Sequence, residues 1–598
     1  MDGGVRRACI AAFRSGQTYS MGKQISTKKF VSNIALSVAA QIVSVLVSFV
    51  MGLIVPKFID EFSYAYWQLY ILYAGYVGVL HFGLLDGIVL RYGAYDYDEL
   101  DKKRIRSQFT CLLLTTALIG VIVASVSLGV MQGERSIVFV LVAVSIVLKN
   151  ITTYNSYIFQ ITNRISRYVI ITIAQRLAYG IAVVVLLVCG VKEFYWYCLA
   201  DIFGDCVGIS IGIALNRGSV YLGRMISLRE TFRELRANLS AGIILMLANW
   251  SSILLIGSAR MIIEWRWGEL TFGKVSFAFS LTNIFLTFVT AVSVVLFPSL
   301  KRIEGDRLPQ MYKNIRELIS PLLFFALMLY FPGSWIVRLW LPNYAVSLDY
   351  LAILLPIIIF SSKVSLLTNN YLKVYRKEKS MLLVNLFSVA LGVAVFSFCA
   401  YGLGHLNAML VSVVLVIMLN SVLSEIVVMR TIKVRIVKEF FYEAALTAGF
   451  ILIAHYLDLL WGFLAYLGLF LVYCALNFRT IGALFRRLLR RRAKSANAAQ
   501  TDVDAAKIAP ALLGEESTQD QASSEHGQGA DTDGAASAEK GETACANENA
   551  PCADGERHAT EKEASCIGDE CGAEGERSAS AEGIPTKKTK GEKHGTEG

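Results

Sequence analysis

Five charged side chains stand out because they lie inside long apolar stretches. Three are the cations Lys149, Arg176 and Lys363, and two are the acids Asp201 and Asp205, one helical turn apart. A charge at the centre of a bilayer costs about 2.5–3.5 kcal/mol on insertion scales, so such residues usually face a partner or a wet cavity. Lysine and arginine also bind phosphate groups. This pattern predicts a polar, largely cationic space inside a membrane protein.

Polar residues accompany two of these cations at helical spacing. Thr153, Ser156 and Gln160 follow Lys149 on one helix face, as expected for a helix that lines a polar space. The region of Lys363 carries a similar pattern. We therefore expect the polar wall to include Thr153, Ser156, Asn155, Asn369 and Asn370.

The acids leave two interpretations open for the first-half cations. They could neutralise Lys149 and Arg176 as buried ion pairs, or the cations could face the cavity. Lys363 differs, because its half of the chain offers no acid at similar depth and Glu425 falls near a helix end. An unpaired lysine favours an anionic ligand, so we expect Lys363→Ala to abolish transport without affecting folding.

The composition requires membrane-spanning helices to position these residues. Hydrophobic residues make up 55% of the 598 residues, charged residues only 17%, and the mean hydropathy is +0.52. A soluble protein carries about a quarter charged residues. Apolar stretches long enough to span a bilayer recur and predict about fourteen transmembrane helices in an all-α polytopic fold. They cover 30–55, 64–90, 108–131, 136–161, 168–190, 194–215, 239–259, 275–300, 317–339, 348–370, 380–402, 405–429, 441–457 and 461–478.

The basic residues predict the orientation. The N-terminus, the even-numbered loops and the end of the last helix hold about 38 lysines and arginines, and the odd-numbered loops hold about 7, Arg260 among them. Because basic residues accumulate on the cytoplasmic side, both termini are predicted to be cytoplasmic.

An internal repeat divides the chain. Lys149, Asn155 and Tyr157 recur as Lys363, Asn369 and Tyr371 at one offset, which lays the first six helices on the next six. A six-helix unit preserves chain direction, so the halves form parallel repeats, and transporters place their substrate site between such halves. The predicted parts are a cytosolic segment at 1–29, an N-lobe at 30–215, a cytosolic loop at 216–238, a C-lobe at 239–429, two further helices with a basic end at 430–494, and a tail at 495–598.

The tail contains 22 acidic and nine basic residues and almost no aromatic ones. Such a segment buries too little apolar surface to fold alone, so we expect a disordered cytosolic extension. The cysteines show no metal-ligand spacing, and no metal site or cofactor is expected.

Four stretches carry a resemblance to a known family. FSYAYWQLYILYAGYVGVLHFGLLDGIVLRYG (Phe62–Gly93) resembles the first-half signature of Wzx-type oligosaccharide flippases, and LFPSLKRIEGD (Leu296–Asp306) resembles the end of their eighth helix. LWLPNYAVSLDYLAILLP (Leu339–Pro356) and SKVSLLTNNYLKVYRKEKSMLLVN (Ser362–Asn385) are similar to their tenth-helix region. The resemblance spans about residues 25–480 and omits the tail.

The resemblance implies the multidrug/oligosaccharidyl-lipid/polysaccharide exporter fold, with two six-helix lobes around a central cavity. It implies outward flipping of an oligosaccharide on a polyprenyl pyrophosphate, in the bacterial cytoplasmic membrane, for cell-surface polysaccharide or lipopolysaccharide synthesis. The expected partners are this lipid-linked substrate, membrane lipids and a polysaccharide polymerase, and no nucleic acid. Alternating access driven by a proton or sodium gradient is implied, with Asp201 or Asp205 as the coupling residue; pairing with the cations would oppose their protonation.

Three other functions deserve comparison. A drug or metabolite antiporter on this fold would need an acidic site, whereas the charge at mid-depth is positive. A lipid II flippase would move a substrate that also carries a pyrophosphate group. A glycosyltransferase is disfavoured, because the DxD of Asp96 and Asp98 lies in a loop too short to form a catalytic domain. We therefore expect no enzyme activity.

Overall fold

The structure is a computed structural model that describes residues 27–93, 95–162, 164–216, 219–301, 305–434 and 438–478. All secondary structure in these ranges is helical. The predicted tail and almost all of the predicted N-terminal segment lie outside the described residues.

The first half, up to the end of the predicted N-lobe, consists of ten described elements. They are α2 (Thr27–Phe49), η1 (Val50–Ile54), α3 (Val55–Phe58), α4 (Glu61–Ala74), η2 (Val77–His81), α5 (Leu84–Tyr92), α6 (Lys102–Val130), α7 (Glu134–Ile161), α8 (Ile165–Val188) and α9 (Phe194–Asn216), with α3 a short continuation of α2.

The second half begins with a long broken helix. Its elements are α10 (Leu228–Lys301), η3 (Gly305–Arg307), α11 (Leu308–Leu327), α12 (Tyr330–Trp340), η4 (Pro342–Tyr344), α13 (Ala345–Leu354), α14 (Ile357–Lys363), η5 (Val364–Thr368), α15 (Asn369–Val374), α16 (Glu378–Ser397), η6 (Phe398–Leu403), α17 (Leu406–Ile432), α18 (Lys438–Tyr456) and α19 (Leu459–Leu476).

The membrane-spanning character agrees with the prediction. Within the described ranges, ten helices are long and apolar enough to cross a membrane, or up to twelve if each bent pair is one span. This count takes the stretch from Leu228 to Thr290 as one helix, although the break at Gly268 divides it into two segments. Each of the fourteen predicted apolar stretches falls on helical segments, some of them broken, and this agrees with the polytopic all-α fold class.

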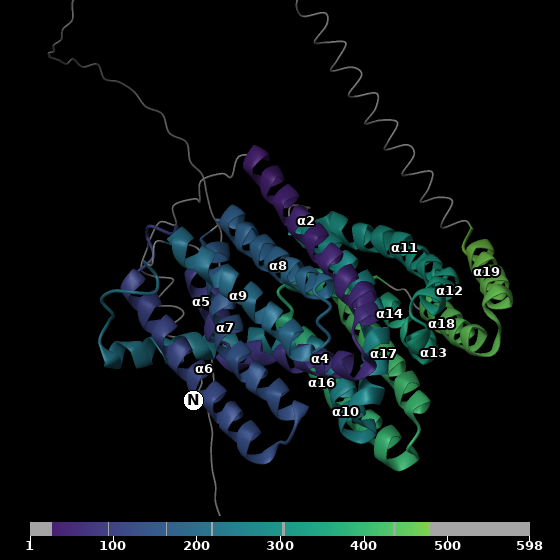
Figure 1. The fold of residues 1–598 in the computed structure, drawn as a ribbon. Helices are drawn as coiled ribbons and strands as arrows, with labels where there is room; N and C mark the ends of the chain where they lie inside the picture. The colour runs from purple at the N-terminus through teal and green to yellow at the C-terminus, as the bar shows by residue number, and fades with distance from the viewer. Residues whose placement is uncertain are drawn as a thin grey trace, which may run out of the picture. The chain divides into compact units, whose positions relative to one another are not determined.

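The helices pack as two groups (Figure 1). In the first, α6 packs on α7 and α8 packs on α9, while α2 lies along α8. In the second, α16 and α17 pack together, and α13 and α14 pack on α17. The α18–α19 hairpin adjoins the second group through α12 and α13. The groups meet where α10 contacts α2, α4 and α5.

Two helices break where the backbone leaves the helical region. The span of α4 and α5 bends by 53° at Phe82 and Gly83, which have φ values of 50° and 87°. Gly268 interrupts α10 with φ 79° and ψ 178°. Glycine occupies such left-handed conformations at little steric cost, so Gly268 separates two helical segments without a loop.

Two segments predicted as loops contain helix. The second half of the expected loop at 216–238 is helical, because α10 begins at Leu228. The expected connection at 260–274 is helical except at Gly268. Charged residues such as Arg229, Glu230 and Arg233 favour helix but lower the hydropathy, so hydropathy alone misses these turns.

Candidate functional site

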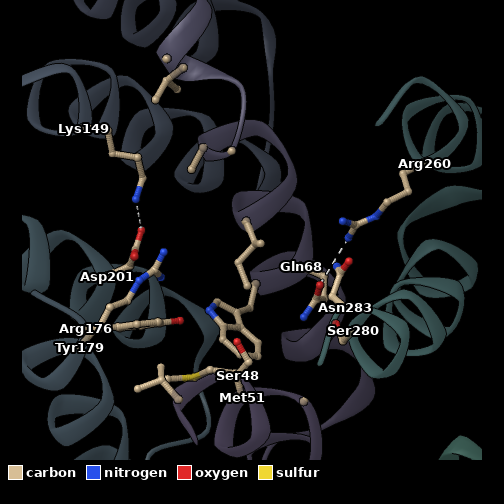
Figure 2. A pocket seen from close by; sticks show the side chains of 18 of the residues that line it. Ser48, Met51, Gln68, Lys149, Arg176, Tyr179, Asp201, Arg260, Ser280 and Asn283 are labelled. Carbon is tan, nitrogen blue, oxygen red and sulfur yellow. Dashed lines mark hydrogen bonds and ion pairs between the residues drawn. The ribbon is translucent and has the colours of Figure 1, made fainter. Parts of the chain in front are cut away.

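A cavity of about 470 Å³ lies between the two helical groups (Figure 2). Elements of the first half provide most of its wall, and α10 provides the opposite side. Its lining residues are Val47, Ser48, Met51, Gly52, Trp67, Gln68, Ile71, Ala74, Gly75, Val77, Gly78, Lys149, Thr153, Arg176, Tyr179, Asp201, Trp250, Arg260, Ser280 and Asn283.

The N-lobe wall holds an ion-paired lysine. The Nζ atom of Lys149 on α7 lies 2.7 Å from Oδ2 of Asp201 and 3.1 Å from Oδ2 of Asp205, both on α9. Tyr70 donates a hydrogen bond to Asp201 over 3.0 Å, and Gln175 donates one to Asp205 over 2.6 Å. The Asp205 side chain is fully buried, whereas Asp201 borders the cavity. Lys149 is thus both an ion-pair partner and a lining residue.

Arg176 on α8 behaves differently from Lys149. It lines the cavity on the same side as Asp201 (Figure 2). Within the described part of the chain it makes no hydrogen bond or ion pair. Its guanidinium group is therefore available to a bound anion.

Arg260 on α10 provides a third cation that the sequence analysis missed. Its Nη2 atom donates to Ser276 Oγ over 3.0 Å and to Gln68 Oε1 over 3.4 Å. Its guanidinium lies 5.4 Å from the ring centre of Phe272, which gives a cation–π contact. Its buried Nε has no hydrogen-bond partner, and no carboxylate among the described residues pairs with it. In Figure 2 it reaches the cavity from the side opposite Arg176.

The prediction that Arg260 lies in a loop is wrong for a simple reason. Hydropathy placed Arg260 in an external loop, because the uninterrupted apolar stretch stops at position 259. The segment MIIEW that follows remains mainly apolar, and Gly268 is the true helix break. Counting the span up to that glycine would have placed Arg260 within the membrane-spanning part.

The cavity wall also carries neutral polar and aromatic groups. Amides are provided by Gln68 and Asn283, a hydroxyl by Ser280, and indole rings by Trp67 and Trp250. Together with three basic lining residues and one acidic one, this produces a cationic site with a hydrogen-bonding and aromatic surround.

The prediction that Lys363 has no acidic partner is wrong. Lys363 is not among the cavity-lining residues, and its Nζ lies 2.7 Å from Glu425 and 2.6 Å from Glu443. Arg316 pairs with the same glutamates at 3.2 and 3.0 Å. These four residues, the C-lobe charge cluster, have side chains at most 3% exposed.

The partner was missed for a physical reason. Glu443 comes from α18, which lies outside the six-helix repeat. Glu425, although near the end of α17, reaches Lys363 because both side chains are long. The repeat-related lysines Lys149 and Lys363 therefore have different surroundings, one at the cavity and one sealed in protein.

The predicted polar residues are divided similarly. Thr153 lines the cavity, and its hydroxyl donates to the Lys149 carbonyl. Asn155 is fully buried against Gly212, and Asn370 is buried and bonds Ser293. Asn369 and Ser156 are partly exposed away from the cavity lining. Of the predicted site residues, the structure brings together Lys149, Thr153, Arg176, Asp201 and Asp205, the last behind the wall.

No cluster of three or more metal-ligating side chains occurs within the described ranges.

Comparisons with known proteins agree on the fold. No protein-family model matches the chain, and no curated protein matches it. Among solved structures, a lipid II flippase MurJ in an inward closed conformation aligns at 11% identity with a TM-score of 0.55, over 75% of this chain and 99% of that one. An inward-facing MATE-family multidrug resistance transporter of the MOP superfamily aligns at 12% identity with a TM-score of 0.52, over 67% and 98%. The chain therefore has the fold of MOP-superfamily transporters.

Proposed function

We propose that this protein is a flippase that moves a polyprenyl-pyrophosphate-linked oligosaccharide from the inner to the outer leaflet of a bacterial cytoplasmic membrane. The observation that carries the proposal is the pair Arg176 and Arg260. These arginines reach one cavity from opposite lobes, and neither has an acidic partner among the described residues.

The arginines fit a pyrophosphate group. Guanidinium groups present several N–H donors in a fixed plane and bind phosphate oxygens in a bidentate manner. Leaving such cations unpaired inside a membrane protein is costly, so a ligand that neutralises them stabilises the loaded state. Lys149 lies in the same wall, but its two aspartates offset its positive charge, so the site depends on the two arginines.

The neutral lining fits the sugars nearest the pyrophosphate. Amides such as Gln68 and Asn283 can donate to and accept from sugar hydroxyls. The indole rings of Trp67 and Trp250 offer apolar faces beside these polar groups. The polyprenyl chain would stay in the lipid while the head group passes between the lobes.

The proposal includes alternating access coupled to a proton or sodium gradient, with Asp201 or Asp205 as the coupling acid. Asp201 is the better placed, because it borders the cavity while Asp205 is sealed behind it. A polysaccharide polymerase is proposed as the partner that consumes the flipped substrate, by analogy with the family named above.

A second function is favoured by one observation. Asp201 offers a carboxylate at the cavity, which a cationic drug could use after displacing Lys149. Transport of a cationic dye would distinguish this ion-coupled antiporter from the proposed flippase.

A lipid II flippase would bind the same pyrophosphate group. It differs from the proposed flippase in the glycan of its substrate.

The test uses purified protein in liposomes with a fluorescent polyprenyl-pyrophosphate oligosaccharide and, in parallel, lipid II. Arg176→Gln and Arg260→Gln are the diagnostic variants. Each removes charge-assisted hydrogen bonds worth about 1.5–3 kcal/mol, so flipping is expected to fall roughly 10- to 100-fold. Unchanged flipping by both variants, with normal expression, would exclude the anion site.

A further inference from the structure

The segment that leads into α10 exposes apolar and basic side chains together. Its large apolar side chains are between 54% and 81% exposed and are Leu222, Met225, Leu228 and Phe232. Its arginines are also exposed and are Arg224, Arg229, Arg233 and Arg236. We call these eight residues the apolar–arginine patch.

The arginines of the patch lack counter-charges in the described part of the chain. None of the four guanidinium groups forms an ion pair or a hydrogen bond there. Glu234 of the same segment is buried and pairs with Arg91 at 2.9 Å. Within residues 219–238 this leaves Glu230 as the one acid that could offset four arginines. The patch therefore has a surplus of positive charge.

Contacts with α6 define the level of the patch in the membrane. Thr110 of α6 donates to the sulfur of Met225 over 3.3 Å, and Gln108 donates to the Thr231 carbonyl over 3.3 Å. At these positions the basic start of α6, KKRIR, gives way to its apolar part, CLLL. The patch therefore lies where the hydrocarbon region meets the lipid head groups.

The apolar side chains of the patch adjoin a lipid-facing surface. Leu114, Leu118 and Val121 of α6 are each more than 60% exposed in a helix that is long and apolar enough to span the membrane. They follow Thr110 at helical spacing and share its face of α6. Met225, which contacts Thr110, therefore extends this surface toward the head groups. Apolar side chains at that level are removed from water when they enter the interface.

The start of α10 orders the arginines. Ser227 precedes this helix, and its hydroxyl accepts a hydrogen bond from the Glu230 N–H over 3.4 Å. Spacings of four and three residues place three arginines on one helix face, namely Arg229, Arg233 and Arg236. Leu228 and Phe232 lie on the adjoining face, since each immediately precedes one of these arginines. The helix thus presents an apolar face beside a cationic one.

We propose that the apolar–arginine patch binds anionic phospholipids of the inner leaflet. Its apolar side chains enter the interface, and its guanidinium groups bind the phosphates of the head groups. The cytoplasmic leaflet is rich in anionic lipids, which attract basic segments near the membrane surface. The basic loops predict that the patch is on this side. The site goes beyond the proposed function, since it applies whatever the cavity carries.

A second basic cluster provides a matched control. Arg376, Lys377 and Lys379 are exposed between α15 and α16, on the same predicted side. No large apolar side chain within the described residues 371–380 is strongly exposed. This cluster therefore offers three cations, as the α10 face does, but no apolar group that could enter the interface.

The test measures which lipids surround each cluster. In a background without native cysteines, a bimane fluorophore is attached through Ser240→Cys beside the patch or through Ser380→Cys beside the control cluster. Each protein is reconstituted in liposomes with head-group nitroxide phosphatidylglycerol or nitroxide phosphatidylcholine at equal mole fractions. The readout is the ratio of quenching by the anionic lipid to quenching by the zwitterionic lipid, and it requires no transport substrate.

The ratio at position 240 is expected to be roughly fivefold at low salt and to fall at high salt. The ratio at position 380 should be near one. This comparison needs no arginine variant, so it decides the question even if the variants fold poorly. A ratio near one at position 240, or equal ratios at both positions, would overturn the proposal.

Substitutions separate the two parts of the patch. Arg229→Gln, Arg233→Gln and Arg236→Gln together should lower the ratio at position 240 to about one. Leu228→Ser with Phe232→Ser should weaken quenching by both lipids, because the segment then leaves the interface. A ratio that the three arginine substitutions leave unchanged would contradict the proposal. Displacement of nitroxide phosphatidylglycerol by a trace of polyprenyl pyrophosphate would also contradict it, since the site would then belong to a pyrophosphate lipid.

Discussion

The ammonium group of Lys149 lies 2.7 Å from Oδ2 of Asp201 at the cavity wall, with Asp205 at 3.1 Å on its other side. One cation thus pairs with two acids, and with both acids ionised the group of three carries one surplus negative charge. Substitutions of the three residues should therefore have unequal effects on stability.

Lys149→Met should therefore be the more damaging change. It leaves two acids without a counter-charge, and uncompensated buried charges typically cost about 3–5 kcal/mol. Asp201→Asn keeps Lys149 paired with Asp205 and is expected to change the apparent free energy of unfolding by less than about 1 kcal/mol. Denaturant titration in detergent measures both. A greater loss for Asp201→Asn would contradict the assigned charge balance.

Gradient dependence separates coupling from stability at Asp201. If this acid binds the coupling ion, Asp201→Asn should still flip lipid slowly but lose its acceleration by a proton or sodium gradient. Flipping is measured in liposomes with and without an imposed gradient. Full acceleration in the variant would remove Asp201 from coupling.

Lys363→Met should destabilise the protein rather than act on substrate. It leaves Arg316 alone with Glu425 and Glu443 in a sealed site, at a cost of about 3–5 kcal/mol. Adding Glu443→Gln restores neutrality and should recover much of the loss. The exposed Lys379 provides the control, since Lys379→Met should be neutral. Unchanged stability with lost flipping would instead support the original expectation that Lys363 binds substrate.

Arg260 and Arg266 form a matched pair on one helix. Arg260 lines the cavity, whereas Arg266 donates to the Ala400 carbonyl and is not a lining residue. Arg260→Gln should weaken substrate binding roughly 10- to 100-fold through loss of charge-assisted hydrogen bonds. Arg266→Gln should affect binding little. A binding titration with the lipid-linked substrate measures the affinity of both variants. Equal losses of affinity would argue against a specific role for Arg260.

Gly87 should not tolerate a side chain. A Cβ there would overlap Asn238 of α10, and overpacking typically costs about 1–3 kcal/mol. Gly87→Ala should therefore lower the apparent melting temperature. Gly129→Ala is the control, because nothing lies within 4 Å of that Cβ position. A neutral Gly87→Ala variant would mean that the lobes are less closely packed than the structure indicates.

The sequence predicts the fold well and the site only in part. Hydropathy locates the long apolar helices, since apolar length is a direct requirement of the bilayer. It also identifies Lys149, Arg176 and Asp201 as charges in apolar surroundings. It fails for Arg260, because the boundary of the span depends on the backbone at Gly268 rather than on composition.

The Lys363 error shows a different limit. Depth along a helix predicts which residues share a layer, but not which helices are neighbours. Glu443 is far from Lys363 in sequence and outside the repeat, so only the packing of α18 reveals the pair. Partners of buried charges depend on tertiary contacts.

The most direct test of the central claim compares flipping of a fluorescent polyprenyl-pyrophosphate oligosaccharide with uptake of a cationic dye, using the same purified protein in liposomes. The protein should flip the lipid without transporting the dye, and flipping should decrease in Arg176→Gln and Arg260→Gln. Dye uptake without lipid flipping, abolished by Asp201→Asn, would contradict it and identify an antiporter instead.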